Sequence, residues 1–221
     1  MTGFMSDMSG GKALALEELC RDRGNACLRF DYAGHGESEG AFADGTIGSW
    51  AADALAALDE LTDGPQVLVG SSMGGWIMLV AALARPGRIA GLVGIAPAPD
   101  FTERLYAEEL TREQRDVMKA EGKVIVPSDY EDDYTFTQAL IDDGKDHLLL
   151  GGEISIDCPV RLIHGMEDDA VPWRTSLAIQ EKLRSDDVEI TFVKGGDHRL
   201  SEPHDLDRLT ATVARLLDKI E

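Results

Sequence analysis

Five short apolar runs, separated by longer segments, constrain the fold most strongly. They are ACLRF (26–30), QVLVG (66–70), IAGLVGIA (89–96), VRLIHG (160–165) and VEITFV (188–193). Runs this apolar predict strands buried on both faces, as in parallel sheets. Four further segments place apolar residues at helical spacing: 11–24, 49–61, 73–87 and 175–185. This alternation predicts an α/β fold, an open and mostly parallel sheet with helices on both faces.

Residues 100–157 interrupt the alternation, because they separate two strands by more than a crossover needs. We predict a small helical cap inserted into one domain that spans residues 1–221. Helices are expected at 103–121 and about 134–143, with an extended piece at 123–130. The insertion carries 6 basic and 16 acidic residues, a net charge of −10. Its larger apolar side chains either line an acyl pocket or form the core of the cap: Phe101, Leu105, Tyr106, Met118, Tyr130 and Phe136.

Charge and composition exclude several classes of protein. The chain has 21 basic and 41 acidic residues, a net charge of −20 that repels nucleic acids and anionic lipid. No apolar run approaches the roughly 20 residues of a membrane-spanning helix, and the N-terminus does not resemble a secretion signal. Cys20, Cys27 and Cys158 show no CxxC spacing, so neither a disulfide framework nor a metal site is expected. These features predict a cytoplasmic protein with no membrane insertion.

A glycine-rich segment directly follows the second apolar run. Gly70-Ser71-Ser72-Met73-Gly74 fits the Gly-x-Ser-x-Gly pattern, which presents a nucleophilic serine on a sharp turn between a strand and a helix. Such a pattern also occurs by chance in turns that carry no chemistry. In the catalytic reading Ser72 is the nucleophile, and the start of the following helix directs N–H groups toward a developing oxyanion.

A nucleophilic serine needs a base and an acid that orients the base, and in this fold class they follow in the order Ser, Asp or Glu, His. Asp168 follows the fourth apolar run and His198 follows the fifth, so both are expected at the same edge of the sheet as Ser72. The sequence leaves competitors open: Asp100 and Asp169 for the acid, and His204 for the base. The remaining histidines, His35, His147 and His164, are placed less favourably.

The segments GSSMGG, HGMEDDAVP and GGDHR together resemble the α/β-hydrolase superfamily, and FDYAGHGESEG resembles a loop typical of it. Other segments, among them DYAGHGES, SSMGGWIML and CPVRLIHGMEDDAVPW, resemble a bacterial branch related to the animal mitochondrial acyl-protein thioesterase and acyl-glucuronide esterase. The resemblance covers nearly the whole chain. It implies a triad at Ser72, Asp168 and His198 and the hydrolysis of esters or thioesters without a cofactor.

The same resemblance implies an oxyanion hole made by two backbone N–H groups, those of Phe4 and Met73. It also implies three strands ahead of residue 4, and the chain contains none of them. We therefore expect the N-terminal strands of the fold to be missing. One of the missing strands would lie inside the sheet, between the strands at 26–30 and 66–70. Either a segment of the protein is therefore absent, or these two strands pair directly.

The sequence thus predicts a serine hydrolase that cleaves carboxylic esters or thioesters through an acyl-enzyme. Its expected partner is a small-molecule substrate, and we expect a monomer or a homodimer. The alternative is a truncated or non-catalytic ligand-binding protein on the same fold, because a fold does not fix a function.

Overall fold

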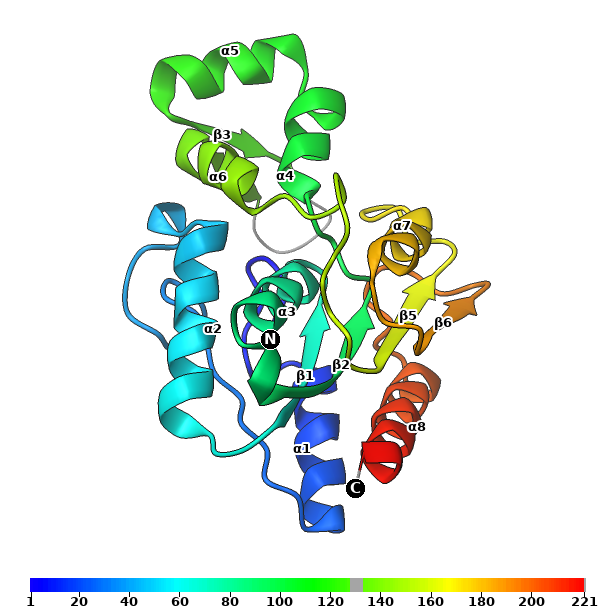
Figure 1. The fold of residues 1–221 in the computed structure, drawn as a ribbon. Coiled ribbons are helices and arrows are strands. Elements are labelled where there is room, and N and C mark those ends of the chain that lie inside the picture. Colours follow the sequence, from blue (N-terminus) through cyan, green and yellow to red (C-terminus); the bar gives the residue numbers. More distant parts are fainter. Residues whose placement is uncertain (128–132, 221) are drawn as a thin grey trace.

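The structure is a computed structural model that describes residues 1–127 and 133–220. Its central sheet has four parallel strands in the order β1-β2-β5-β6 (Figure 1). They are β1 (Gln66–Ser71), β2 (Ile89–Ile95), β5 (Val160–Gly165) and β6 (Val188–Val193). The registers align Ser71 with Ile95 and Gly165 with Val193, so the carboxyl ends of the strands share one edge. The predicted α/β fold with a parallel sheet is confirmed.

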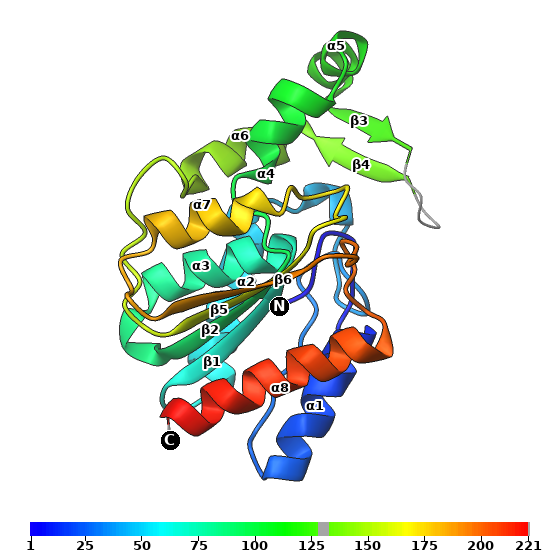
Figure 2. The same cartoon turned by 90° about the vertical axis from the view of Figure 1, so that its right-hand side faces the viewer.

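Helices cover both faces of this sheet (Figure 2). On one face lie α2 (Ile47–Leu61), α3 (Met73–Ala84) and α7 (Arg174–Lys182). On the other lie α1 (Gly11–Arg23) and α8 (Pro203–Ile220). Every residue of β5 is buried, including the polar residues Arg161 and His164.

The predicted strand at 26–30 does not form. This segment has no regular secondary structure, and Ala26, Cys27 and Leu28 are exposed. The outer side of β1 instead contacts Met1, whose amino group donates to the Val69 carbonyl at 2.9 Å and whose carbonyl accepts from the Ser71 N–H at 3.2 Å. The prediction was wrong because apolar composition favours a strand only where a neighbouring strand supplies hydrogen bonds.

The segment 100–157 extends beyond the carboxyl ends of the strands and then returns along the molecule to the start of β5 (Figure 1). It contains α4 (Phe101–Arg104), a π-helical turn (Leu105–Glu109), α5 (Arg112–Glu121), β3 (Lys123–Val126), β4 (Tyr134–Thr137) and α6 (Gln138–Gly144). Short 3-10 helices lie here at Lys145–His147 and elsewhere at Phe42–Asp44 and Pro86–Arg88.

Both helices predicted in this segment need correction. The helix expected at 103–121 breaks at Leu110, which is extended, and α5 restarts after Thr111. The Thr111 hydroxyl accepts from the Gln114 N–H while the Gln114 side chain accepts from the Thr111 N–H. The helix expected from about 134 begins only at Gln138, because Tyr134–Thr137 pair with β3 as an antiparallel strand.

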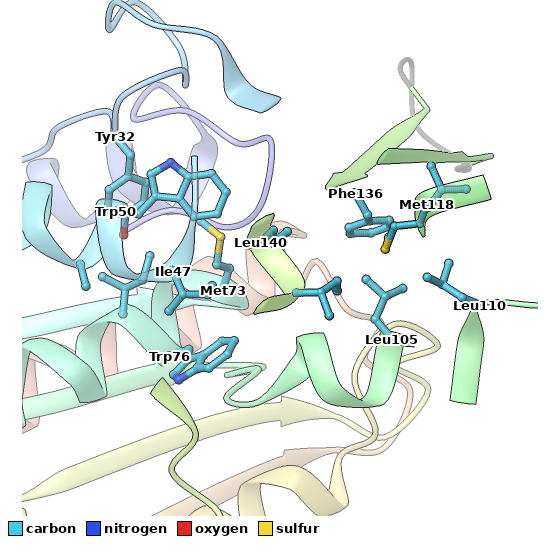
Figure 3. Packing of buried hydrophobic residues seen from close by; sticks show 14 of the residues in the cluster. Tyr32, Ile47, Trp50, Met73, Trp76, Leu105, Leu110, Met118, Phe136 and Leu140 are labelled. Carbon is cyan, nitrogen blue, oxygen red and sulfur yellow. The ribbon is translucent and has the colours of Figure 1, made fainter. Parts of the chain in front are cut away.

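A hydrophobic cluster joins this segment to the rest of the molecule (Figure 3). It runs from Trp50 and Met73 on α2 and α3 to Leu105, Met118 and Phe136. The last three side chains are 4%, 0% and 7% exposed, so they belong to the core and are not free to line an acyl pocket. Phe101 and Tyr106 are only partly buried. Tyr130, also expected at the pocket, lies outside the described residues.

Candidate active site

Ser72 occupies the turn between β1 and α3. Its backbone has φ 54° and ψ −122°, a conformation that residues with a side chain rarely adopt. Three backbone hydrogen bonds hold it: the Ser72 N–H donates to the Ile95 carbonyl at 2.9 Å, and the Ser72 carbonyl accepts from Gly75 at 2.9 Å and from Ala98 at 3.1 Å. The hydroxyl therefore stands at the point where the strand ends and the helix begins.

The glycines on either side of Ser72 are required by close backbone contacts. A Cβ at Gly70 would lie 2.3 Å from the Gly74 carbonyl oxygen, and a Cβ at Gly74 would lie 2.4 Å from the Thr2 carbonyl oxygen. Both distances are far inside van der Waals contact. The Gly-x-Ser-x-Gly spacing thus lets β1, α3 and the N-terminal segment meet at the serine.

Gly74→Ala is expected to lower the free energy of unfolding by about 1–3 kcal/mol, because the added methyl group meets fixed backbone. The steric cost of the methyl group is expected to outweigh the roughly 1 kcal/mol by which alanine stabilises a helix relative to glycine. The control variant is Gly87→Ala, since a Cβ at Gly87 meets no atom within 4 Å. Urea unfolding of the two variants compares their free energies of unfolding. Equal stability of the two variants would contradict the steric account.

Ser72, His198 and Asp168 lie in one hydrogen-bonded series. His198 Nε2 is 3.1 Å from the Ser72 hydroxyl, and His198 Nδ1 is 2.8 Å from Oδ2 of Asp168. The side chain of Asp168 is fully buried and that of His198 is 17% exposed. The three residues singled out in the sequence are therefore brought together, with the imidazole between the hydroxyl and the carboxylate.

Two loops at the carboxyl edge of the sheet hold the acid and the base. The loop after β5 is fixed to the loop after β6 by two hydrogen bonds, from the Met166 N–H to the Val193 carbonyl at 2.8 Å and from the Glu167 N–H to the Gly196 carbonyl at 2.9 Å. The bonded residues come shortly before Asp168 in one loop and shortly before His198 in the other. The separation of the two side chains is therefore set by backbone pairing of their loops.

The carboxylate of Asp168 has four hydrogen-bond donors. Oδ1 accepts from the Ala170 N–H at 2.9 Å and the Val171 N–H at 2.7 Å. Oδ2 lies 2.8 Å from His198 Nδ1 and 3.1 Å from His164 Nε2. Burial alone would raise the pKa of Asp168, but the hydrogen bonds from His164 and His198 outweigh it and hold this pKa well below that of an ordinary carboxyl. Asp168 is therefore a carboxylate at neutral pH.

The competing acids lie elsewhere. The carboxylate of Asp100 accepts from the Leu149 and Leu150 N–H groups at 2.8 and 2.9 Å, so it ties α4 to the segment before β5. Burial raises the pKa of Asp100, and these two hydrogen bonds oppose the rise. Asp169 is exposed. Neither carboxylate is hydrogen-bonded to His198 in the part of the chain that the structure describes.

The other histidines do not contact Ser72. The side chain of His204 is 69% exposed and lies 3.5 Å from the Asp205 carboxylate, and His147 pairs with Asp143 at 3.6 Å. His35 is buried among aromatic rings, including those of Tyr32, Phe42 and Trp50, and burial lowers its pKa. His164 is completely buried against Asp168, a contact that the sequence analysis did not predict.

The N-terminal segment passes directly over the serine. A Cβ built on Gly3 would lie 3.4 Å from the Ser72 Cβ, and Met73 is the first residue of α3. The backbone N–H groups of Phe4 and Met73 have no hydrogen-bond partner among residues 1–127 and 133–220. The ring of Phe4 stacks on Phe136 at 5.2 Å and meets Phe42 edge-on at 4.7 Å, which anchors this segment to β4 and to the 3-10 helix Phe42–Asp44.

A cavity of about 300 Å³ lies between α4 and α7, lined by Pro99, Phe101 and Val171 among others. Ser72 and His198 are not among the residues that line it. The described residues contain no group of three or more potential metal ligands. No helix in the described ranges is long and apolar enough to cross a membrane.

The sequence profile of the α/β hydrolase fold matches residues 11–120, and the chain belongs to this family. The human palmitoyl-protein thioesterase ABHD10 is 42% identical over 220 residues, 99% of this chain and 72% of that protein. The mouse α/β hydrolase domain-containing protein 10 superposes with a TM-score of 0.92 at 41% identity, covering 100% of this chain and 89% of that one. A structure from Agrobacterium vitis S4 is also 41% identical, with a TM-score of 0.94 and coverage of 100% and 86%.

These relatives correct the expected location. The names of the human, bovine and mouse thioesterases place them in mitochondria, which contradicts the cytoplasmic location predicted from the sequence. That prediction rested on the absence of a secretion signal and of a long apolar run. Neither feature separates cytoplasm from an organelle whose targeting signals differ from those of secretion.

Proposed function

We propose that the protein is a serine hydrolase that cleaves carboxylic esters or thioesters through a Ser72-His198-Asp168 triad. The observation that carries the proposal is the hydrogen-bonded series of these three side chains, with Ser72 held at positive φ on the strand-to-helix turn. The α/β hydrolase fold of the chain supports hydrolysis as the class of reaction.

In the proposed reaction His198 accepts the proton of Ser72 while the serine oxygen attacks the carbonyl carbon. The buried Asp168 holds the imidazole with its proton on Nδ1 and stabilises the cation that forms. The tetrahedral oxyanion accepts hydrogen bonds from the Phe4 and Met73 N–H groups, whose lack of other partners supports this role. His198 then protonates the leaving group, and a water molecule activated by the same imidazole releases the acid.

We infer that the substrates are acyl thioesters of proteins or peptides as well as neutral carboxylic esters. The relatives at 42% identity are named palmitoyl-protein thioesterases, which favours a thioester. The net charge of −10 on residues 100–157 disfavours polyanionic leaving groups such as coenzyme A. Phe101 and Tyr106 remain candidates for contact with the acyl chain, since both are only partly buried.

We further propose that residues 1–221 form one domain in which residues 100–157 act as a cap over the triad. Every side chain of the proposed triad and both oxyanion donors come from one chain. The site therefore needs no second subunit, and the protein would work as a monomer or as a homodimer.

A hydrolysis panel tests this function. It compares aryl esters of graded acyl length, S-acylated peptides and acyl-coenzyme A, with Ser72→Ala as the control. The proposal predicts turnover of esters and acylated peptides and much weaker turnover of acyl-coenzyme A. The proposed function would be overturned if the protein hydrolysed none of these substrates. Rates on acyl-coenzyme A comparable to those on the esters would overturn only the charge argument.

The dependence of kcat/KM on pH follows from the lowered pKa of Asp168. A carboxyl with a depressed pKa stays ionised until the pH falls to that low value, so Asp168 adds no protonation step to the acid limb of the profile, which reports the proposed base alone. The logarithm of kcat/KM should rise over the acid limb with a slope of one. A slope that approaches two would mean that Asp168 also gains a proton in this range, contrary to its hydrogen bonding.

A further inference from the structure

His164 is the one histidine besides His198 that touches the proposed triad in the described part of the chain. It lies on β5 with its side chain completely buried. Its Nε2 is 3.1 Å from Oδ2 of Asp168 and 3.0 Å from the Val171 carbonyl oxygen, and its Nδ1 is 2.7 Å from the Ser176 hydroxyl on α7. Both ring nitrogens are therefore hydrogen-bonded inside the protein.

These partners define where the ring proton lies. A carboxylate and a carbonyl can only accept, so Nε2 must carry the hydrogen that both oxygens face. Nδ1 then accepts from the hydroxyl of Ser176, which is itself completely buried. The Nε2–H tautomer satisfies every group around the ring. Ser176 thus holds His164 as a donor toward Asp168.

The same carboxylate oxygen serves both histidines. Oδ2 accepts from His164 Nε2 and His198 Nδ1, while Oδ1 accepts two backbone N–H groups. An ionised carboxylate offers about four acceptor sites, and all of them are occupied. The carboxylate consequently has one favourable orientation, and the donor from His164 fixes the oxygen that faces His198.

We propose that His164 is a positioning residue of the triad, which holds Oδ2 of Asp168 at the point from which it orients His198. This inference rests on the proposed function, since it assigns His164 a role in the same reaction. His164 itself does not reach the substrate, because it is buried behind the carboxylate. Its effect passes through Asp168 to the tautomer and the placement of His198.

Paired substitutions at position 164 test the proposal. His164→Gln retains an N–H close to the position of Nε2, whereas His164→Leu fills similar space without a donor. We expect His164→Leu to lower kcat about 10- to 100-fold with KM changed less than about 3-fold, a range typical of lost supporting hydrogen bonds at metal ligands. His164→Gln should recover kcat to within about 5-fold of the wild type.

Leu162→Ala is the matched control for loss of packing. Leu162 is 1% exposed and lies two residues earlier on the same strand, on the same face of the sheet, and its apolar side chain cannot donate a hydrogen bond to Asp168. It should destabilise the protein to urea while leaving kcat within about 2-fold of the wild type. The rate constant for labelling by a fluorophosphonate should follow kcat across all variants, because it reports the reactivity of the serine.

The outcomes separate this inference from the function on which it rests. Hydrolysis that survives Ser72→Ala would overturn the proposed function itself. A Ser72-dependent enzyme in which His164→Leu keeps wild-type kcat, or in which Leu162→Ala loses as much kcat, would overturn only the role of His164.

If His164→Leu does not fold, His164→Asn replaces it, because the asparagine N–H lies near the position of Nδ1 and cannot reach Asp168. Equal kcat in the Gln and Asn variants would then overturn the role.

Discussion

Ser72→Ala is expected to lower kcat/KM for ester hydrolysis by about 10⁴- to 10⁶-fold, the scale of losing the nucleophile of a serine triad. Among residues 1–127 and 133–220 the hydroxyl makes one hydrogen bond, with His198 at 3.1 Å, so its removal leaves the turn intact. The free energy of unfolding should stay within about 0.5 kcal/mol of the wild type, since alanine retains the Cβ. Initial-rate kinetics and urea unfolding of the same preparations measure both effects.

Ser71→Ala is the matched control for this experiment. Ser71 is the last residue of β1, next to the proposed nucleophile, and its backbone N–H is bonded to the Met1 carbonyl. Removing its hydroxyl should leave kcat/KM within about 3-fold of the wild type, as expected for a side chain outside the reacting set. Retention of activity by Ser72→Ala together with its loss in Ser71→Ala would reverse the assignment of the two serines.

Asp168→Asn is expected to lower kcat by about 10⁴-fold, although the side chain keeps its shape. The amide of asparagine can donate a hydrogen bond to His198 Nδ1, which then places the ring proton on Nε2. Nε2 faces the Ser72 hydroxyl and in that tautomer cannot accept its proton. The loss should appear in kcat more than in KM, because the change acts on proton transfer and not on substrate contact.

Asp169→Asn controls for the charge that Asp168→Asn removes. Asp169 is the next residue, is exposed and undergoes the same chemical change. Its kcat should remain within about 2-fold of the wild type, because exposed charges are screened by solvent. A similar loss in both variants would mean that the overall charge of the loop matters and that the tautomer of His198 does not. Steady-state kinetics of the two variants at one ionic strength distinguishes these accounts.

Much of the candidate site was predictable because each part has a local sequence signal. The close backbone contacts at positions 70 and 74 require glycine there, and this produces the Gly-x-Ser-x-Gly pattern visible in the sequence. Asp168 and His198 follow buried strands, and parallel strands bring their carboxyl ends to one edge. The role of His164 was not predictable in this way. Its spacing from Asp168 is visible, but the contact with Oδ2 depends on how the loop after β5 folds back onto the strand.

The errors in the fold have two physical causes. Residues 26–30 and 134–137 have similar strand-forming composition, yet only the second forms a strand, because β3 lies beside it. The break at Leu110 was missed because charged and apolar residues continue at helical spacing across it, while the Thr111 and Gln114 side chains start a new helix. Local patterns indicate what a segment can form, and its neighbours in space decide what it does form.

Peptide mapping after fluorophosphonate treatment tests the central claim most directly, because the reagent reacts with an activated serine and the adduct does not turn over. The account predicts one adduct per chain, on Ser72, at a rate that falls sharply in Asp168→Asn. The absence of an adduct on a protein that hydrolyses esters, or an adduct on Ser71, would contradict it.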